Sequence, residues 1–253
     1  MNPNGELTSQ ISSSGVRSIT FGHPAHNSFP SNQLTALVAA ISAAGNDEDT
    51  RSILLRSQGD RTFCAGANLD ELLAINDKEA GQEFFMGFGR VLLAMRDCPK
   101  PIVVAVQGKA IGGGVGIAAA ADYCLATEAA AIKLSELSIA IGPFVILPAL
   151  RRKMGIAATG ELCLDTEWHS AAWAHEKGLY QRLLPSPKEL YTAATALAEK
   201  LATHSPQATA ALKAALWEGT RAWPWLIEER AEISGRLVLT EPAKAALAQF
   251  KKK

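Results

Sequence analysis

The chain has 253 residues, and its 25 lysines and arginines balance its 25 aspartates and glutamates, so the formal net charge is +0. The chain is neutral and its one basic block is the tail at 251–253, which argues against a nucleic-acid-binding protein. No apolar stretch reaches the roughly 18 residues needed to span a bilayer. The polar residues 1–14 lack the order of a secretion signal, and the four cysteines have no C-x-x-C spacing. We therefore expect a cytoplasmic protein with packed, reduced thiols and without nucleic-acid, membrane or metal partners.

The N-terminal part of the chain alternates strand and helix patterns. Residues 6–11 and 16–21 alternate around a Ser/Gly turn, which predicts a β-hairpin. A helix is predicted over 30–46, because apolar residues there recur at helical spacing. Residues 52–55 form a predicted buried strand, and an amphipathic helix over about 80–96 ends before two prolines.

The middle of the chain repeats the order strand, turn, helix. Residues 102–106 are continuously apolar, as expected of a strand covered on both faces, and they lead into a predicted helix over 115–121. Short strands are predicted at 123–126 and 131–133. The repeated order predicts an α/β core with parallel strand pairing over residues 1–185.

The strand patterns cease near residue 185. Three helical stretches follow, at 187–203, 206–217 and 225–238. We therefore expect a helical region over 186–253 attached to the α/β core.

Two glycine-bearing segments carry the chemistry. Residues 63–69 read FCAGANL and residues 107–116 read QGKAIGGGVG, and each lies between a strand pattern and a helix pattern. Backbone N–H groups in the first turn of a helix have no internal partner and lie at its positive end, so two such turns can form an oxyanion hole. A dinucleotide fingerprint fails because Ile117 stands where it needs glycine, and a P-loop fails because Ala110 follows the lysine.

The chain resembles the crotonase (enoyl-CoA hydratase/isomerase) superfamily over nearly its whole length. Members of that superfamily carry, in the same order, segments similar to the two glycine turns, to the strand KPIVVAVQG at 100–108 and to the Ala-Ala-Asp at 120–122. The resemblance implies a ClpP/crotonase-like spiral core of ββα repeats with a helical C-terminal trimerisation region. It also implies homotrimers, often paired into hexamers, and an acyl-CoA thioester as the substrate. Coenzyme A is then part of the substrate, and no separate cofactor is expected.

The resemblance also assigns candidate site residues. The oxyanion donors would be the backbone N–H groups of Ala67 and Gly113. Further residues are expected to contact the substrate or its coenzyme A: Ala65, Asn68, Leu69, Gly112, Phe144, Phe250 and Lys253. Asparagine replaces the usual aspartate at position 68 and caps a helix about as well. Phe144 either fills acyl space or packs beneath its loop.

The catalytic carboxylates depart from the hydratase pattern. Hydratases of the superfamily carry two glutamates, and at the matching positions this chain has Gly116 and Glu136. Addition of water uses two acid–base groups, whereas a 1,3 proton shift needs one base that removes a proton and returns it elsewhere. Asp70 or Glu71, just after the first glycine turn, could substitute for the second acid.

We therefore expect an enzyme that isomerises an enoyl-CoA through an oxyanion-stabilised enolate, with Glu136 as a single proton shuttle. Three alternatives stay open. The first is hydration of a short or branched 2-enoyl-CoA. The second is decarboxylation or C–C cleavage of a β-carboxyacyl thioester, and the third is a non-catalytic acyl-CoA-binding subunit, which Gly116 suggests.

Overall fold

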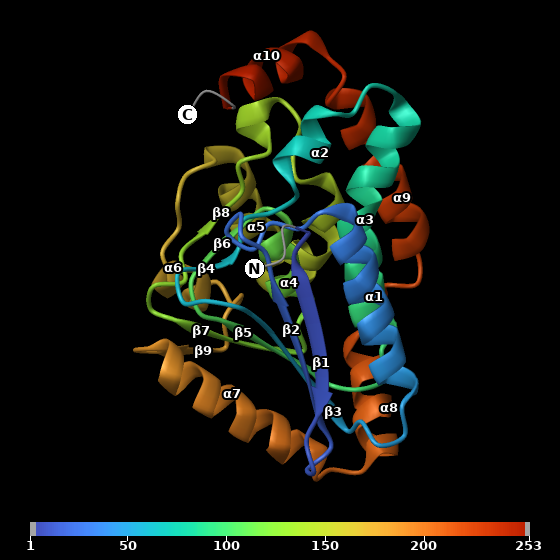
Figure 1. The fold of residues 1–253 in the computed structure, drawn as a ribbon, viewed down its shortest axis with the longest axis vertical. Helices are drawn as coiled ribbons and strands as arrows, with labels where there is room; N and C mark the ends of the chain where they lie inside the picture. The colour runs from blue at the N-terminus through green and yellow to red at the C-terminus, as the bar shows by residue number, and fades with distance from the viewer. Residues whose placement is uncertain (1–3, 251–253) are drawn as a thin grey trace.

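The computed structural model describes residues 4–250, and its larger sheet has six strands in the order β1-β2-β3-β5-β7-β9 (Figure 1). The strands are β1 (Glu6–Ile11), β2 (Val16–Gly22), β3 (Ser52–Ser57), β5 (Ile102–Val106), β7 (Tyr123–Thr127) and β9 (Arg182–Leu184). β1 and β2 pair antiparallel as the predicted hairpin, and every other neighbouring pair is parallel. The predicted α/β core with parallel pairing is confirmed.

A smaller parallel sheet is formed by β4 (Thr62–Cys64), β6 (Lys109–Ile111) and β8 (Ile132–Lys133). Each of these strands follows a strand of the larger sheet along the chain, so β3-β4, β5-β6 and β7-β8 are successive two-strand units. The first two units are followed by helices, which produces the ββα repeat. The small sheet places the ends of β4 and β6 beside each other, with Cys64 paired to Ala110.

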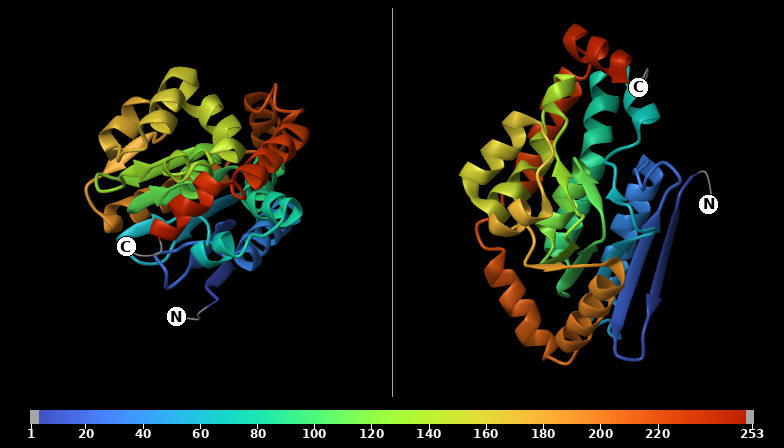
Figure 2. Two further views of the ribbon diagram at one scale, coloured as in Figure 1. Left: turned by 90° about the horizontal axis from the view of Figure 1, so that it is seen from above. Right: turned by 90° about the vertical axis from the view of Figure 1, so that its left-hand side faces the viewer.

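Helices cover both faces of the larger sheet (Figure 2). On one face lie α1 (Ser31–Asn46), α3 (Lys78–Asp97) and α4 (Gly113–Ala120), whose apolar side chains share a core with the sheet. On the other face lies α7 (Pro187–Ala202), which follows the predicted boundary at residue 185. All five residues of β5 are buried, as expected of a strand covered on both sides.

The remaining helices are α2 (Leu69–Leu73), α5 (Leu147–Asp165), α6 (Ala171–Glu176), α8 (Pro206–Leu216), α9 (Trp223–Leu237) and α10 (Glu241–Phe250), with short 3-10 turns η1 (Leu137–Ile139) and η2 (Phe144–Ile146). The sequence patterns do not predict α5, α6 or α10. In α5 the period is obscured because Ile156 and Leu164 are largely exposed and Gly155 adopts a non-helical conformation with φ of 75°. No helix within residues 4–250 combines the length and apolarity needed to cross a membrane.

Contacts at Asp122 and at Gly81 help to hold the C-terminal helices against the core. The carboxylate of Asp122 accepts hydrogen bonds from the Ile102 N–H and the Trp217 indole, and its Oδ2 lies 2.7 Å from the buried Lys213 ammonium. Helices α3 and α9 cross at two glycines, because a Cβ added to Gly81 would lie 2.7 Å from the Cα of Gly235. Near this close crossing, Ser234 of α9 lines a cavity that Phe84, Phe85 and Phe88 of α3 also line.

Candidate active site

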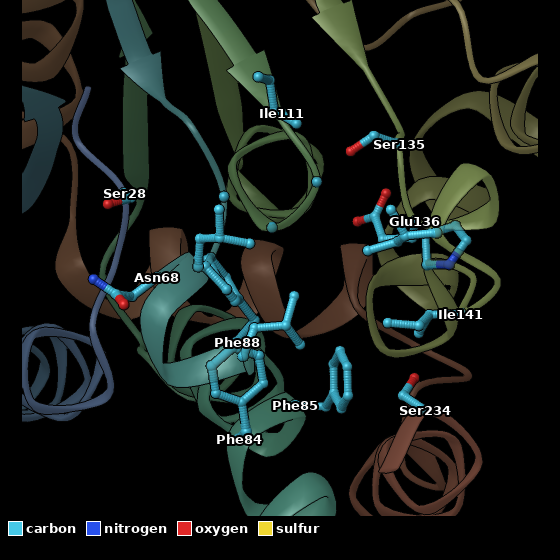
Figure 3. A pocket seen from close by; sticks show the side chains of 18 of the residues that line it. Ser28, Asn68, Phe84, Phe85, Phe88, Ile111, Ser135, Glu136, Ile141 and Ser234 are labelled. Carbon is cyan, nitrogen blue, oxygen red and sulfur yellow. The ribbon is translucent and has the colours of Figure 1, made fainter. Parts of the chain in front are cut away.

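The two glycine turns lie side by side. Ala67 and Gly113 are each three residues beyond the paired Cys64 and Ala110, so the register of the small sheet brings them to the same level. A Cβ built on Gly66 would lie 3.5 Å from the Ile111 carbonyl oxygen, which shows how closely the turns approach. Both turns line one cavity of about 500 Å³, shown in Figure 3.

The backbone N–H groups of Ala67 and Gly113 donate no hydrogen bond to any described residue. Around Ala67, the neighbouring groups are used instead, since Phe29 donates to the Gly66 carbonyl and Asn68 donates to the Phe29 carbonyl. Gly113 is the first residue of α4 and therefore has no partner within the helix. Two donors are thus left over at adjacent turns, one of them at the positive end of a helix.

Each glycine of the second turn is required by a different neighbour. Gly112 has φ of 54° and ψ of −119°, a conformation that favours glycine, and a Cβ there would lie 2.7 Å from a Glu136 carboxylate oxygen. A Cβ on Gly113 would overlap the Phe88 ring, and one on Gly114 would lie 2.6 Å from the Cβ of Cys64. The small residues of this turn are therefore required by packing within the protein.

Glu136 borders the cavity beside the second turn, as its proximity to Gly112 shows. Its backbone carbonyl accepts hydrogen bonds from Ile139 and Ile141, which fixes the loop that carries it. Its Oε2 is buried and has no hydrogen-bond partner among the described residues. Burial raises the pKa of this carboxyl from 4.5 to about 7, although nearby backbone N–H groups partly oppose the effect. A carboxyl with this pKa can both take and return a proton near neutral pH.

An apolar side chain fills the space beside Gly116, the position at which the hydratase pattern has a second glutamate. A Cβ added to Gly116 would lie 2.6 Å from Cγ2 and 3.0 Å from Cβ of Ile146, which itself lines the cavity. Glu71 does not line the cavity, because its carboxylate accepts hydrogen bonds from the backbone N–H and hydroxyl of Ser31 and so caps α1. Asp70 is exposed and does line the cavity.

Eight of the predicted site residues line this cavity: Ala65, Ala67, Asn68, Leu69, Gly112, Gly113, Glu136 and Phe144. The predicted helix cap at Asn68 is confirmed, since its Oδ1 accepts from the Glu71 N–H at 3.0 Å. Lys253 and the side chain of Phe250 lie outside the described part of the chain.

Many of the other cavity residues were not anticipated from the sequence, among them Phe88, Ile146 and Ser234. Each belongs to a segment whose local pattern indicates only a packed apolar face or a small helical residue. Cys64, directly behind the first turn, is buried in apolar surroundings that raise the pKa of its thiol to about 12. It is therefore a packed thiol rather than a nucleophile.

Charged groups at the cavity are few. Among the described lining residues the acids are Asp70 and Glu136, and there is no lysine or arginine. Most of the wall is apolar and includes the rings of Phe84, Phe85 and Phe88. Within residues 4–250, no three histidine, cysteine or acidic side chains gather in a way that could hold a metal ion.

The chain is similar in sequence to known proteins. The family model described as Enoyl-CoA hydratase/isomerase matches residues 12–249. A probable enoyl-CoA hydratase from Bacillus subtilis is 30% identical over 240 residues, covering 94% of this chain and 93% of that protein. A peroxisomal Delta(3,5)-Delta(2,4)-dienoyl-CoA isomerase from Arabidopsis thaliana is 28% identical over 227 residues, covering 83% of this chain and 80% of that protein.

Solved structures show the same fold. The crystal structure of an enoyl-CoA hydratase from Bacillus halodurans superposes with a TM-score of 0.88 at 24% identity, covering 96% of this chain and 99% of that one. A putative enoyl-CoA hydratase from Mycobacterium avium paratuberculosis gives a TM-score of 0.86 at 25% identity, covering 98% and 96%. The predicted crotonase-type fold is confirmed, and the chain belongs to the enoyl-CoA hydratase/isomerase family.

Proposed function

We propose that the chain shifts the double bond of a 3-enoyl-CoA thioester, with Glu136 as the single proton shuttle. The thioester oxygen accepts hydrogen bonds from the N–H groups of Ala67 and Gly113. The Glu136 carboxylate removes a C2 proton, and the electron pair of that C–H bond moves toward the thioester oxygen to form an enolate. The same carboxyl then returns the proton at C4, which leaves the double bond between C2 and C3 and restores the carboxylate.

The observation that carries this proposal is the position of Ile146. Because its side chain occupies the space that any side chain at Gly116 would need, the second acid of a two-glutamate hydratase has no room there. A 1,3 proton shift needs only one base, which Glu136 supplies. In other enzymes a single oxyanion donor contributes roughly 3 to 4 kcal/mol, so two donors can supply a large part of the rate enhancement.

The pKa of Glu136 also supports this assignment. A general base works best when its pKa lies near the working pH, and burial brings this carboxyl to about 7. Among the described residues, Glu136 is the one cavity acid whose oxygen is buried without a partner.

The test is a panel of 2-enoyl- and 3-enoyl-CoA thioesters assayed with the wild type and Glu136→Gln. Isomerisation of a 3-enoyl thioester raises the absorbance of the conjugated product, whereas hydration of a 2-enoyl thioester lowers it. We expect the rise with the wild type and its loss in Glu136→Gln, while the exposed control Glu128→Gln keeps it. A fall with 2-enoyl-CoA and no reaction of 3-enoyl-CoA would refute the proposal.

Hydration of a short or branched 2-enoyl-CoA is the second candidate. It is favoured by Asp70, an acid at the cavity that could position water, and by the hydratase names of several relatives. Asp70→Asn should then abolish the fall in absorbance with 2-enoyl-CoA without preventing isomerisation. For a decarboxylase, the cavity offers no lysine or arginine among its described lining residues to hold a β-carboxylate. Coenzyme A binding without turnover of any thioester would favour a non-catalytic subunit.

We also propose assembly as a homotrimer or hexamer. The large apolar side chains of Ile156, Leu164 and Trp225 are 67%, 74% and 72% exposed, and apolar side chains of this size are suited to a subunit interface. Light scattering of the purified protein would test this, and a monomer at micromolar concentration would contradict it. A cytoplasmic location stays a prediction.

A further inference from the structure

One polar group in the cavity has no role in the chemistry described above. Ser234 lies on α9, is 1% exposed, and its Oγ has no hydrogen-bond partner among the described residues. It lines the cavity together with Phe85 and Ile141. In the view of Figure 3, Ile141 lies between Glu136 and Ser234, so the serine is at the end of the cavity away from the oxyanion turns.

A serine or threonine hydroxyl within a helix commonly donates a hydrogen bond to a backbone carbonyl of the preceding turn. Four threonines of this protein do so by donating to the carbonyl four residues earlier, namely Thr35, Thr159, Thr192 and Thr209. Ser234 makes no such bond, although its helix provides carbonyls at the same spacing. An unsatisfied buried hydroxyl is costly, so its hydrogen-bonding capacity points to a group that enters the cavity.

Close packing does not explain the hydroxyl. Ser234 adjoins Gly235, where α9 crosses α3 closely, and this crossing demands a small side chain. Alanine would meet that demand, as Ala231 does one turn earlier in the same helix. The oxygen of Ser234 is therefore the feature that packing leaves unaccounted for.

The surroundings define the chemistry of the partner. The nearby wall is apolar, with Phe85, Ile141 and Leu247, and the described lining residues include no lysine or arginine. A carboxylate on the acyl group would be desolvated without a counter-charge and would share the cavity with Asp70 and Glu136. A neutral oxygen meets neither obstacle, and a serine hydroxyl can donate to it or accept from it.

We propose that Ser234 is a specificity-determining residue that binds a neutral hydroxyl or keto oxygen at the far end of the acyl group. The preferred substrates are accordingly oxygenated acyl-CoA thioesters. This inference rests on the proposed function, because it requires the thioester carbonyl to lie at Ala67 and Gly113 with the acyl chain extending past Glu136.

Binding of unreactive, saturated thioesters tests the inference without catalysis. Calorimetry would compare butanoyl-, hexanoyl- and octanoyl-CoA with their ω-hydroxy and ω-oxo derivatives, and adipoyl-CoA would supply a carboxylate end. For the chain length that reaches Ser234, we expect the wild type to bind the oxygenated form roughly tenfold more tightly, the change that one net hydrogen bond produces. Ser234→Ala should lose this preference, and the control Thr192→Ala, an exposed helical hydroxyl, should keep it.

Thermal unfolding of the unliganded protein separates this role from a structural one. Because Ser234→Ala removes a buried hydroxyl without a partner, its melting temperature should equal or exceed that of the wild type. A lower melting temperature with an intact preference for oxygenated thioesters would show a structural role and overturn the inference.

The remaining outcomes distinguish the two proposals. If plain acyl-CoA thioesters bind but no chain length shows a preference for oxygen, the inference fails and the proposed function stands. Tightest binding of adipoyl-CoA would also overturn it. If no acyl-CoA binds to the wild type at all, the proposed function fails and the inference fails with it.

Discussion

Replacing Glu136 by glutamine should change how stability depends on pH. Burial raises the pKa of this carboxyl to about 7 in the folded protein, and in the unfolded chain it returns to 4.5. The folded state therefore binds the proton more tightly, so the stabilisation is complete below pH 4.5 and is lost as the pH rises through about 7. At about 1.4 kcal/mol for each pH unit between the two values, the loss is about 3 kcal/mol.

Glutamine is neutral at every pH and avoids this loss. We expect the stability of Glu136→Gln minus that of the wild type to rise by about 3 kcal/mol between pH 4.5 and pH 8, because all other titrating groups cancel in the difference. For a chain of this size, that corresponds to a relative gain in melting temperature of roughly 6 to 12 °C.

The assay is denaturant unfolding of both proteins at intervals of pH, with Glu128→Gln as a control substitution at an exposed position. In parallel, kcat/KM of the wild type for a 3-enoyl-CoA should rise with an apparent pKa near 7, since the carboxylate form is the base in the proposed reaction. A stability difference between Glu136→Gln and the wild type that does not vary with pH would show that the carboxyl is not desolvated, and would refute the reasoning.

Three further predictions concern packing at the site and beneath the C-terminal helices. Gly116→Glu alone should lower the free energy of unfolding by about 1 to 3 kcal/mol, because the new side chain overlaps Ile146. Adding Ile146→Ala to this variant should recover part of that stability and introduce hydration of 2-enoyl-CoA. If Gly116→Glu is as stable as the wild type, the predicted overlap is wrong. Gly113→Ala should lower kcat by roughly 10²-fold or more, because its methyl group displaces the Phe88 ring beside a proposed oxyanion donor. An unchanged kcat in steady-state kinetics would contradict this. Asp122→Ala leaves buried donors unpaired and should cost about 3 to 5 kcal/mol in urea unfolding, against less than 1 for the exposed control Asp49→Ala.

Local sequence patterns were sufficient for much of the fold. The hairpin, the buried strand at 102–106 and the amphipathic helix α3 follow from the periodicity of apolar residues, which is a local property. Helix α5 was missed because two of its large apolar residues, Ile156 and Leu164, face outward. Apolar residues of α5 lie both on its exposed side and on its buried side, and the periodicity of the sequence does not distinguish the two sides.

The sequence by itself determined the family and the pair of glycine turns. A turn of this kind depends on residues that are adjacent in the chain, namely glycines that allow positive φ angles, small side chains and a residue that caps the helix. The sequence also predicted Glu136 as the single catalytic glutamate. Only the tertiary structure decided that Ile146 occupies the place of a second acid, that Glu71 is engaged in capping α1, and that Ser234 faces the cavity. These three facts depend on contacts between segments distant in the chain, and burial, which sets the pKa of Glu136, exists only once those segments have packed together.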